Sequence, residues 1–395
     1  MFHFRLISTV LLTALLGSAI SGCNKKAQAP EAANTAAINV TAGSEIVIGE
    51  VGSLTGADAT FGTSTRDGID LALKQINDAG GLNGKKLRVI VLDDQGKSEE
   101  AATAVTKLIS QDKVTAILGE VASSRSLAMA PIAQQYKVPM VSPSSTNPEV
   151  TKKGDYIFRV CFIDPFQGSV MAKFAYNTLK VKRAAILRDV KNDYSMGLAQ
   201  FFTETFKKLG GEIVAESSYS GSDMDFKSQL TAIKGKNPEA IFVPGYYNDV
   251  GLIARQAREL GIKVPLLGGD GWDSSKLKEI GGSALDGSFF SNHYTPDDQS
   301  PRVQKFIAEY KAIYNVVPDG LAAMGYDSAI VLFDALKRAK SLGGSDIRDA
   351  LASTKNFPGV TGNITIDADR NAVKSAVIIE VKNGGFVFKE TINPI

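Results

Sequence analysis

The chain has 395 residues, with 44 Lys and Arg against 42 Asp and Glu, so its formal net charge is only +2. This near balance argues against nucleic acid or an anionic membrane surface as the main partner. The whole chain contains two His and two Cys, which excludes most common catalytic and metal-binding chemistry. The length suggests two or three domains, and a hydrophobic content of 44% provides ample core.

The first 22 residues are typical of a bacterial secretion signal. Residues 6–20 are almost wholly apolar or small, a length that suits a signal-peptide core and is short for a membrane span. The stretch ends in Ile-Ser-Gly before Cys23, a pattern that indicates lipidation of this cysteine after removal of residues 1–22. An ordinary signal peptide with a coincidental cysteine is the alternative.

Three expectations follow for the mature chain. Residues 23–45 are rich in Ala, Asn, Pro and Thr, and we expect a flexible tether. Cys161 lies in the apolar run YIFRVCF, and with Cys23 lipidated it becomes a buried core thiol without a disulfide partner. His293, the one histidine left after loss of the signal, lies among aromatic residues, which favours a structural position.

From residue 45 onward, short apolar runs alternate with amphipathic segments. The predicted strands are 45–54, 86–94, 114–121, 138–144, 156–162, 183–190, 212–219, 240–247 and 264–270. The predicted helices between them are 64–80, 98–112, 123–136, 194–210 and 249–261. This alternation predicts an α/β protein with parallel sheets covered on both faces, and the number of strands favours two sheets of four to five strands, with a break near 155–165.

The C-terminal third follows a different pattern. Helices are predicted at about 301–315, 321–341 and 345–354. The tail after them is β-rich, and Asn383-Gly384-Gly385 predicts a hairpin turn between two antiparallel strands.

No motif indicates an enzyme. The chain contains no GxSxG, HExxH or P-loop sequence, and the glycines of 49–56 have the wrong spacing for a dinucleotide-binding turn. Any Ser–His or Cys–His pair would depend on His293. We therefore predict no catalytic residue, no metal site and no cofactor.

Three turns that follow predicted strands are unusually rich in Ser, Thr and Gly: 119–124, 142–149 and 268–272. In α/β sheets, ligands bind beyond the carboxyl ends of the strands. Hydroxyls and free N–H groups at helix starts suit a small anion, and Asp270 supplies one negative charge. This combination fits a zwitterion such as an amino acid, while helix capping and turn formation are the alternative reading of the same residues.

At these turns the chain resembles a known family, the periplasmic branched-chain amino acid binding proteins of ABC importers. The matching segments are IVIGEVGSLTGADATFG (46–62), INDAGGLNGKKLRVIVLDD (76–94), LGEVASS (118–124), VSPSSTNPE (141–149), DYSMGLA (193–199), PGYYNDVGLIARQAR (244–258) and GGDGW (268–272). The resemblance implies the two-lobed type I periplasmic binding protein fold, in which each lobe is a mostly parallel sheet flanked by helices.

The resemblance also implies a domain division. Lobe 1 would comprise 46–163 and 293–356, and lobe 2 would comprise 164–292 and 357–395. The chain would then cross between the lobes three times, near residues 163, 292 and 357.

The family's ligand contacts can be carried over to matching residues. The ligand carboxylate would be bound by Ser123 and by the Ser144 and Thr146 backbone, together with the Thr146 hydroxyl. Asp270 would pair with the ligand ammonium.

Other implied contacts are apolar or aromatic. Tyr194 and Tyr246 would reach the ligand from lobe 2, although both suit ordinary aromatics at the cleft rim. Ala122, Ser145 and Phe61 would border the side-chain pocket, with Phe61 equally suited to the core.

Two departures from the family pattern concern other positions. A disulfide found in some relatives is absent, because the corresponding positions lie near Gly96 and at Ala122. Pocket aromatics of the 320–326 region have no clear match, so the preferred ligand side chain stays open. We expect Trp272 to pack near the cleft.

The implied function is capture of a branched-chain or other apolar amino acid in a cleft between the lobes and its delivery to the permease of an ABC transporter. We expect a monomer in the periplasm or at the outer cell surface, attached to the membrane through the lipid on Cys23 and binding no nucleic acid. A ligand-sensing receptor domain for an amide, urea or aromatic acid is the alternative. Asp270 favours a ligand that carries an ammonium group, because its charge would repel an acid lacking one.

Overall fold

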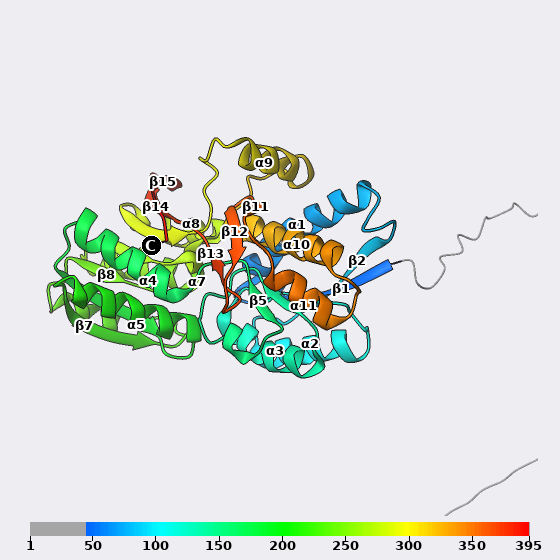
Figure 1. The fold of residues 1–395 in the computed structure, drawn as a ribbon. Helices are drawn as coiled ribbons and strands as arrows, with labels where there is room; N and C mark the ends of the chain where they lie inside the picture. Colours follow the sequence, from blue (N-terminus) through cyan, green and yellow to red (C-terminus); the bar gives the residue numbers. More distant parts are fainter. Residues whose placement is uncertain (1–44, 395) are drawn as a thin grey trace, which may run out of the picture. The chain divides into compact units, whose positions relative to one another are not determined.

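The computed structural model describes residues 45–394, so the predicted signal, Cys23 and nearly all of the predicted tether lie outside the described residues. Two large sheets organise the described chain (Figure 1). We call the part built on the first sheet lobe 1 and the part built on the second sheet lobe 2.

The sheet of lobe 1 is entirely parallel, with the strand order β2-β1-β3-β4-β5. Its strands are β1 (Glu45–Gly52), β2 (Lys86–Asp93), β3 (Ile117–Leu118), β4 (Met140–Ser142) and β5 (Ile157–Arg159). Its helices are α1 (Ala59–Asp78), α2 (Ser98–Ser110), α3 (Ser123–Tyr136), α9 (Pro301–Tyr314), α10 (Gly320–Arg338) and α11 (Gly344–Ala352). Residues of α1, α10 and α11 form one apolar core with the sheet, and residues of α2 and α3 form another, so helices cover both faces.

The sheet of lobe 2 has the order β15-β14-β10-β9-β8-β6-β7, and its last two strands in the sequence are antiparallel. Its strands are β6 (Arg183–Asp189), β7 (Glu212–Tyr219), β8 (Ala240–Phe242), β9 (Leu266–Gly268), β10 (Ser288–Asn292), β14 (Ala376–Lys382) and β15 (Gly385–Ile392). Its helices are α4 (Asp164–Lys173), α5 (Asp193–Lys208), α6 (Lys227–Lys234), α7 (Tyr247–Glu259) and α8 (Ser275–Gly281). Helices α4 and α5 pack on one face, and α6, α7 and α8 pack on the other.

Both sheets are wound in the same way. In each, the second strand along the chain lies outside the first, and the following strands are added on the opposite side. The strand order therefore reverses next to β1 in lobe 1 and next to β6 in lobe 2. Ligands of such folds bind beyond the carboxyl ends of the strands at this reversal.

A small antiparallel sheet follows α11 and belongs to lobe 1. It consists of β11 (Phe357–Gly359), β12 (Gly362–Ile366) and β13 (Ala372–Val373), and its apolar residues join the core of the first sheet. The third crossing therefore lies between β13 and β14, at Lys374 and Ser375, whereas the sequence analysis placed it near residue 357. The sequence shows one continuous β-rich tail, and only packing separates its two halves.

The predicted parallel α/β architecture is confirmed, as are the C-terminal hairpin and the buried position of Cys161. The second sheet is larger than predicted, because β10 and the hairpin extend it. Strand β10 and the helices α4, α6 and α8 were not predicted, since such short segments contain too few apolar positions to establish a period.

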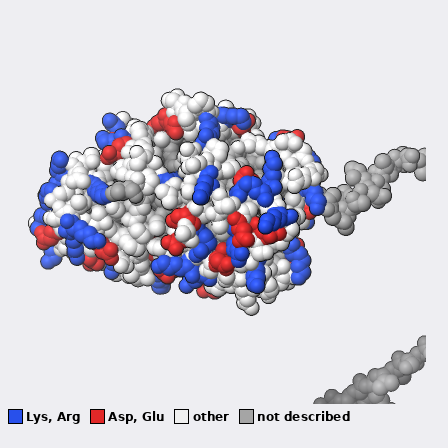
Figure 2. Space-filling model, in the orientation of Figure 1, with Lys and Arg blue, Asp and Glu red and all other residues white. Residues whose placement is uncertain are grey.

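The surface agrees with the balanced composition. Basic and acidic side chains are interspersed on the face shown in Figure 2. Across residues 45–394, no helix is both long enough and apolar enough to cross a membrane.

Candidate ligand-binding site

A small cavity lies where the strand ends of the two lobes meet. We call it the interlobe cavity; it is lined by Phe61, Val121, Ser123, Ser144, Tyr194, Tyr246, Asp270, Gly271 and Leu321. Its volume is about 20 Å³, which is room for about one water molecule. The structure therefore shows a closed form, in which a larger ligand would have to separate the lobes.

Hydrogen bonds between the lobes hold this closed form. The Tyr247 hydroxyl donates to the carbonyl oxygen of Ala57 at 2.7 Å, and the Asn147 side-chain amide donates to the carbonyl oxygen of Asp193 at 2.9 Å. Each bond joins a helix start of one lobe to a turn of the other. Apolar contacts add to these bonds, because Phe61 of lobe 1 packs edge-on against the Tyr247 ring of lobe 2 with 5.0 Å between ring centroids.

The lobe 1 wall of the cavity is built from the start of α3 and from the turn that follows β4. Ser123 is the first residue of α3, so its side chain lies beside N–H groups that have no partner within the helix. Its Oγ accepts a hydrogen bond from the Asn147 N–H at 3.2 Å, which ties the turn after β3 to the turn after β4. The helix start and the hydroxyl together favour an anionic group at this end of the cavity.

Two residues of the turn after β4, Ser145 and Thr146, were predicted to contact the ligand but are buried behind the cavity wall in this closed form. The Ser145 hydroxyl contacts the carbonyl oxygens of Glu120 and Val121 and the Ser126 hydroxyl, all within lobe 1. Thr146 is buried, and its carbonyl oxygen accepts from the N–H of Asp164 at 2.9 Å. Neither residue lines the interlobe cavity, and the predicted contact Ala122 borders the outer part of the cleft instead.

Asp270 forms the opposite, lobe 2 wall directly after β9, and only 5% of its surface is exposed. Its Oδ1 accepts a hydrogen bond from Gln167 Nε2 at 2.8 Å. Its Oδ2 lies 3.0 Å from His293 Nε2 and 3.3 Å from the Ser144 Oγ. The sequence analysis predicted Asp270 and Ser144 as ligand contacts but did not predict Gln167 or the contact between His293 and Asp270. The predicted structural position of His293 among aromatic residues is confirmed, because its buried ring stacks on Phe162 with 3.7 Å between ring centroids.

Aromatic rings close the sides of the cavity. Tyr246 stacks on Tyr194 with 5.5 Å between ring centroids, and Phe61 of lobe 1 meets Tyr246 edge-on at 5.1 Å. The Tyr194 hydroxyl accepts from the Gly271 N–H at 3.2 Å, and burial raises the pKa of this tyrosine well above its ordinary value. These predicted residues therefore come together, with Phe61 in contact with both the core and the cavity.

Val121 and Leu321 complete the apolar lining and were not among the predicted contacts. Leu321 is buried in the first turn of α10, within the region that matched no family pattern. Trp272 is fully buried, and its indole N–H donates to the carbonyl oxygen of Val243 at 2.9 Å, so it supports the wall without lining the cavity.

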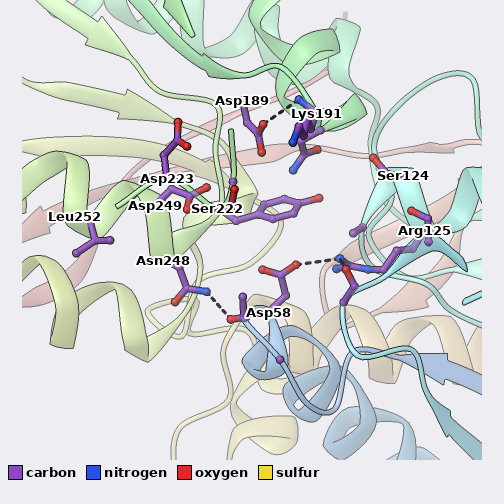
Figure 3. Close-up of a pocket in the computed structure, with 18 of the residues that line it drawn as sticks. Asp58, Ser124, Arg125, Asp189, Lys191, Ser222, Asp223, Asn248, Asp249 and Leu252 are labelled. Atoms are coloured by element: carbon purple, nitrogen blue, oxygen red, sulfur yellow. Dashed lines mark hydrogen bonds and ion pairs between the residues drawn. The ribbon is translucent and has the colours of Figure 1, made fainter. Parts of the chain in front are cut away.

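Outside the interlobe cavity the cleft widens into an outer pocket of about 770 Å³ (Figure 3). On its lobe 1 side, Arg125 contacts Asp58 at 2.9 Å and Glu120 at 3.0 Å. On its lobe 2 side, burial, followed by the nearby charge of Asp189, raises the pKa of Asp249 to about 8. Among residues 45–394, no cluster of His, Cys, Asp and Glu could hold a metal ion.

The two lobes have matching topology and are joined by crossing segments. A small cavity with polar and apolar lining residues lies where the strand ends of the two lobes meet. These features define a two-lobed binding protein. Comparison with known proteins agrees with this class. The family described as "Periplasmic binding protein" matches residues 45–385, and the chain belongs to this family.

Relatives that are named for binding branched-chain amino acids are similar to this chain along most of its length. The Leu/Ile/Val-binding protein BraC3 of Rhizobium johnstonii is 30% identical, covering 81% of this chain and 87% of the relative. A leucine binding protein of Thermotoga maritima is 43% identical with a TM-score of 0.85, covering 88% of this chain and 99% of that structure. The branched-chain amino acid transporter substrate binding protein of Streptococcus pneumoniae, solved with isoleucine, is 37% identical with a TM-score of 0.84, covering 89% and 100%.

These findings confirm the predicted family and the two-lobed α/β fold. The family consists of extracytoplasmic substrate-binding proteins, which are not enzymes. The predicted residue contacts with a ligand are not tested by them and remain proposals.

Proposed function

We propose that this chain captures an amino acid with an aliphatic side chain in the interlobe cavity and delivers it to the permease of an ABC transporter. The observation that carries the proposal is the placing of buried Asp270 across the cavity from Ser123 at the start of α3. A carboxylate on one side and a helix start on the other suit the ammonium and carboxylate of one small zwitterion. The ligands named for the Thermotoga and Streptococcus proteins support the same class.

In this proposal, the ligand carboxylate binds the Ser123 hydroxyl and the N–H groups around it, and the ligand ammonium binds Asp270. The aliphatic side chain packs against Phe61 and Leu321. Exclusion of water by the closed lobes strengthens both charged contacts, because the local dielectric constant falls. The Ser144 hydroxyl, which contacts Asp270 in this structure, gives way to the ammonium.

Entry of the ligand requires movement of the lobes, because the closed cavity has room for about one water molecule. The three crossing segments act as the hinge of an opening and closing motion that is common in such folds. Ligand binds to the open form, and the lobes then close around it, with a wider cavity than the one in this structure. The permease then recognises the closed form of the monomer.

Calorimetry with the purified mature chain tests this function. Leucine, isoleucine, valine, alanine and phenylalanine would be titrated separately at neutral pH. We expect heat of binding with the aliphatic amino acids and the tightest binding among the branched ones. No heat with any amino acid would contradict the proposal.

We further propose that residues 1–22 are removed and that lipid on Cys23 anchors the protein, with residues 23–45 as the tether. The support is the apolar stretch that ends in small residues before Cys23. Cys23→Ser should reduce the amount of the protein in the membrane fraction of cells. The protein should also be larger, because it remains a precursor, and it should carry no lipid label. Equal membrane recovery and equal size of both proteins would contradict lipidation.

A further inference from the structure

His293 connects the carboxylate of Asp270, the proposed partner of the ligand ammonium, to the hinge. It lies directly after β10 in the second crossing segment, and only 3% of its surface is exposed. Its ring stacks on Phe162, from the first crossing, with 3.7 Å between ring centroids. Its Nε2 lies 3.0 Å from Oδ2 of Asp270, so one side chain contacts both crossing segments and the site.

Gln167 holds the other oxygen of the same carboxylate. It is fully buried on α4, and its Nε2 donates to Oδ1 of Asp270 at 2.8 Å. Neither Gln167 nor His293 lines the interlobe cavity. Both therefore act on a ligand only through the position and charge of Asp270.

The hydrogen bonds also indicate where the imidazole carries its hydrogen. An ionised carboxylate only accepts hydrogen bonds, so the hydrogen shared with Asp270 belongs to Nε2 of His293. The other nitrogen, Nδ1, is buried and has no hydrogen-bond partner among the described residues. A neutral ring tolerates this arrangement, whereas an imidazolium would bury an unpaired N–H donor.

We propose that Gln167 and His293 are positioning residues for the ligand ammonium, and that neutral His293 keeps the Asp270–His293 pair at a net charge of −1. Protonation of His293 would bring the pair to zero and remove the preference for a ligand with an ammonium group. This inference rests on the amino-acid function proposed above. It adds that the site prefers a zwitterion to an acid without an ammonium group only while one buried histidine, His293, is neutral.

The groups around the ring set the direction of the pH effect. Burial lowers the pKa of His293, the contact with Asp270 raises it, and the charge of Lys374 in the third crossing lowers it, with a net lowering. Of the groups that face Asp270, burial raises the pKa of Asp164 to about 8 and that of the Cys161 thiol to about 12. Burial also lowers the pKa of Lys374 to about 8. The pKa values of Asp164, Cys161 and Lys374 therefore lie above 7, so among these groups and His293 it is His293 that gains charge as the pH falls below 7.

The first test uses the unchanged protein and two ligands of one shape. Leucine and 4-methyl-2-oxopentanoate, which lacks the ammonium, would be titrated calorimetrically between pH 7.5 and 5. We expect leucine affinity to fall by up to about tenfold per pH unit once the pH is below the pKa of His293, and affinity for the oxo acid to rise. Leucine binding that does not change with pH would overturn the inference while leaving the proposed function intact. No binding of any amino acid at pH 7.5 would instead overturn the function, and the inference with it.

Two variants separate positioning from packing. His293→Gln retains an N–H donor but cannot titrate, so leucine should bind within a few-fold of the unchanged protein at pH 7.5 and lose its pH dependence. Gln167→Met retains the volume without the donor, and it should weaken leucine binding while sparing the oxo acid. An unchanged pH profile in His293→Gln, or equal loss of both ligands in Gln167→Met, would overturn the assigned roles.

A third measurement needs no variant. Residues 24–395 contain one histidine, so the ring nitrogens of His293 can be observed alone by NMR of histidine-labelled protein that carries no histidine tag. At pH 7 we expect a neutral ring with hydrogen on Nε2, and a lower pKa in the leucine-bound form. A ring protonated at pH 7, or one with hydrogen on Nδ1, would contradict the inference.

Discussion

The Ser144 Oγ lies 3.3 Å from Oδ2 of Asp270, and this hydrogen bond joins lobe 1 to lobe 2 across the interlobe cavity. The serine hydroxyl therefore occupies part of the space that an ammonium bound to Asp270 would take. The carboxylate is already held on both oxygens by Gln167 and His293, so it can accept the ammonium without turning. Preorganisation of this kind reduces the cost of binding.

Asp270→Asn should abolish most leucine binding while preserving the shape of the wall. Loss of one partner from a buried charge pair costs about 3–5 kcal/mol, so the Kd should rise at least about a hundredfold. Calorimetry checks the prediction, with Asp369→Asn as a control because Asp369 is an exposed aspartate outside the cavity. Unchanged leucine affinity in Asp270→Asn would contradict the role of this residue.

Leu321→Ala should change ligand preference. Leu321 is 4% exposed and lines the cavity, so shortening it leaves room for a larger ligand side chain. We expect affinity for phenylalanine relative to valine to rise by about tenfold or more. Leu336→Ala on the same helix is the matched control, because Leu336 is equally buried in the lobe 1 core away from the cavity. Both variants should lose about 2–5 kcal/mol of stability, and an equal change of preference in both would contradict the assignment.

Much of this site could be predicted from local patterns. Apolar runs and amphipathic helices located the strand ends, and the hydroxyl-rich turns and Asp270 were expected there because ligands of α/β folds bind at strand ends. The closeness of Ser144 and Asp270 is different, since it depends on how two separate sheets meet.

The residues that were missed share a physical reason. Gln167 lies on a short helix without a clear period, and its contact with Asp270 spans 103 positions in the sequence. A single Leu321 at a helix start carries no pattern at all. The family resemblance placed Ser145 at the border of the side-chain pocket, but neighbouring residues of a turn point in different directions, and in this structure its hydroxyl is turned into lobe 1.

Arg125→Met should destabilise lobe 1. Arg125 is 5% exposed and lies 3.0 Å from buried Glu120 and 2.9 Å from Asp58, so the variant leaves carboxylates buried without a counter-charge. We expect a loss of about 3–5 kcal/mol in the free energy of unfolding, measured by urea denaturation. Arg88→Met is the control, because its ion pair with Glu45 is exposed and worth less than about 1 kcal/mol. Equal effects of the two variants would show that burial does not decide the outcome.

Glu50→Gln should change how stability depends on pH while leaving leucine binding unchanged. Glu50 lies on β1 with 1% of its surface exposed, outside the interlobe cavity. Burial first, and then the charge of Asp70, raises its pKa from 4.5 to about 8. The folded state thus holds a proton that the unfolded state releases above about pH 4.5, so the stabilisation is complete below that pH and is lost as the pH rises toward 8. The free energy of unfolding of the unchanged protein, measured by urea denaturation, should therefore fall by up to about 1.4 kcal/mol per pH unit relative to that of Glu50→Gln across this range. Parallel stability curves for the two proteins would mean that Glu50 is ionised in the folded state.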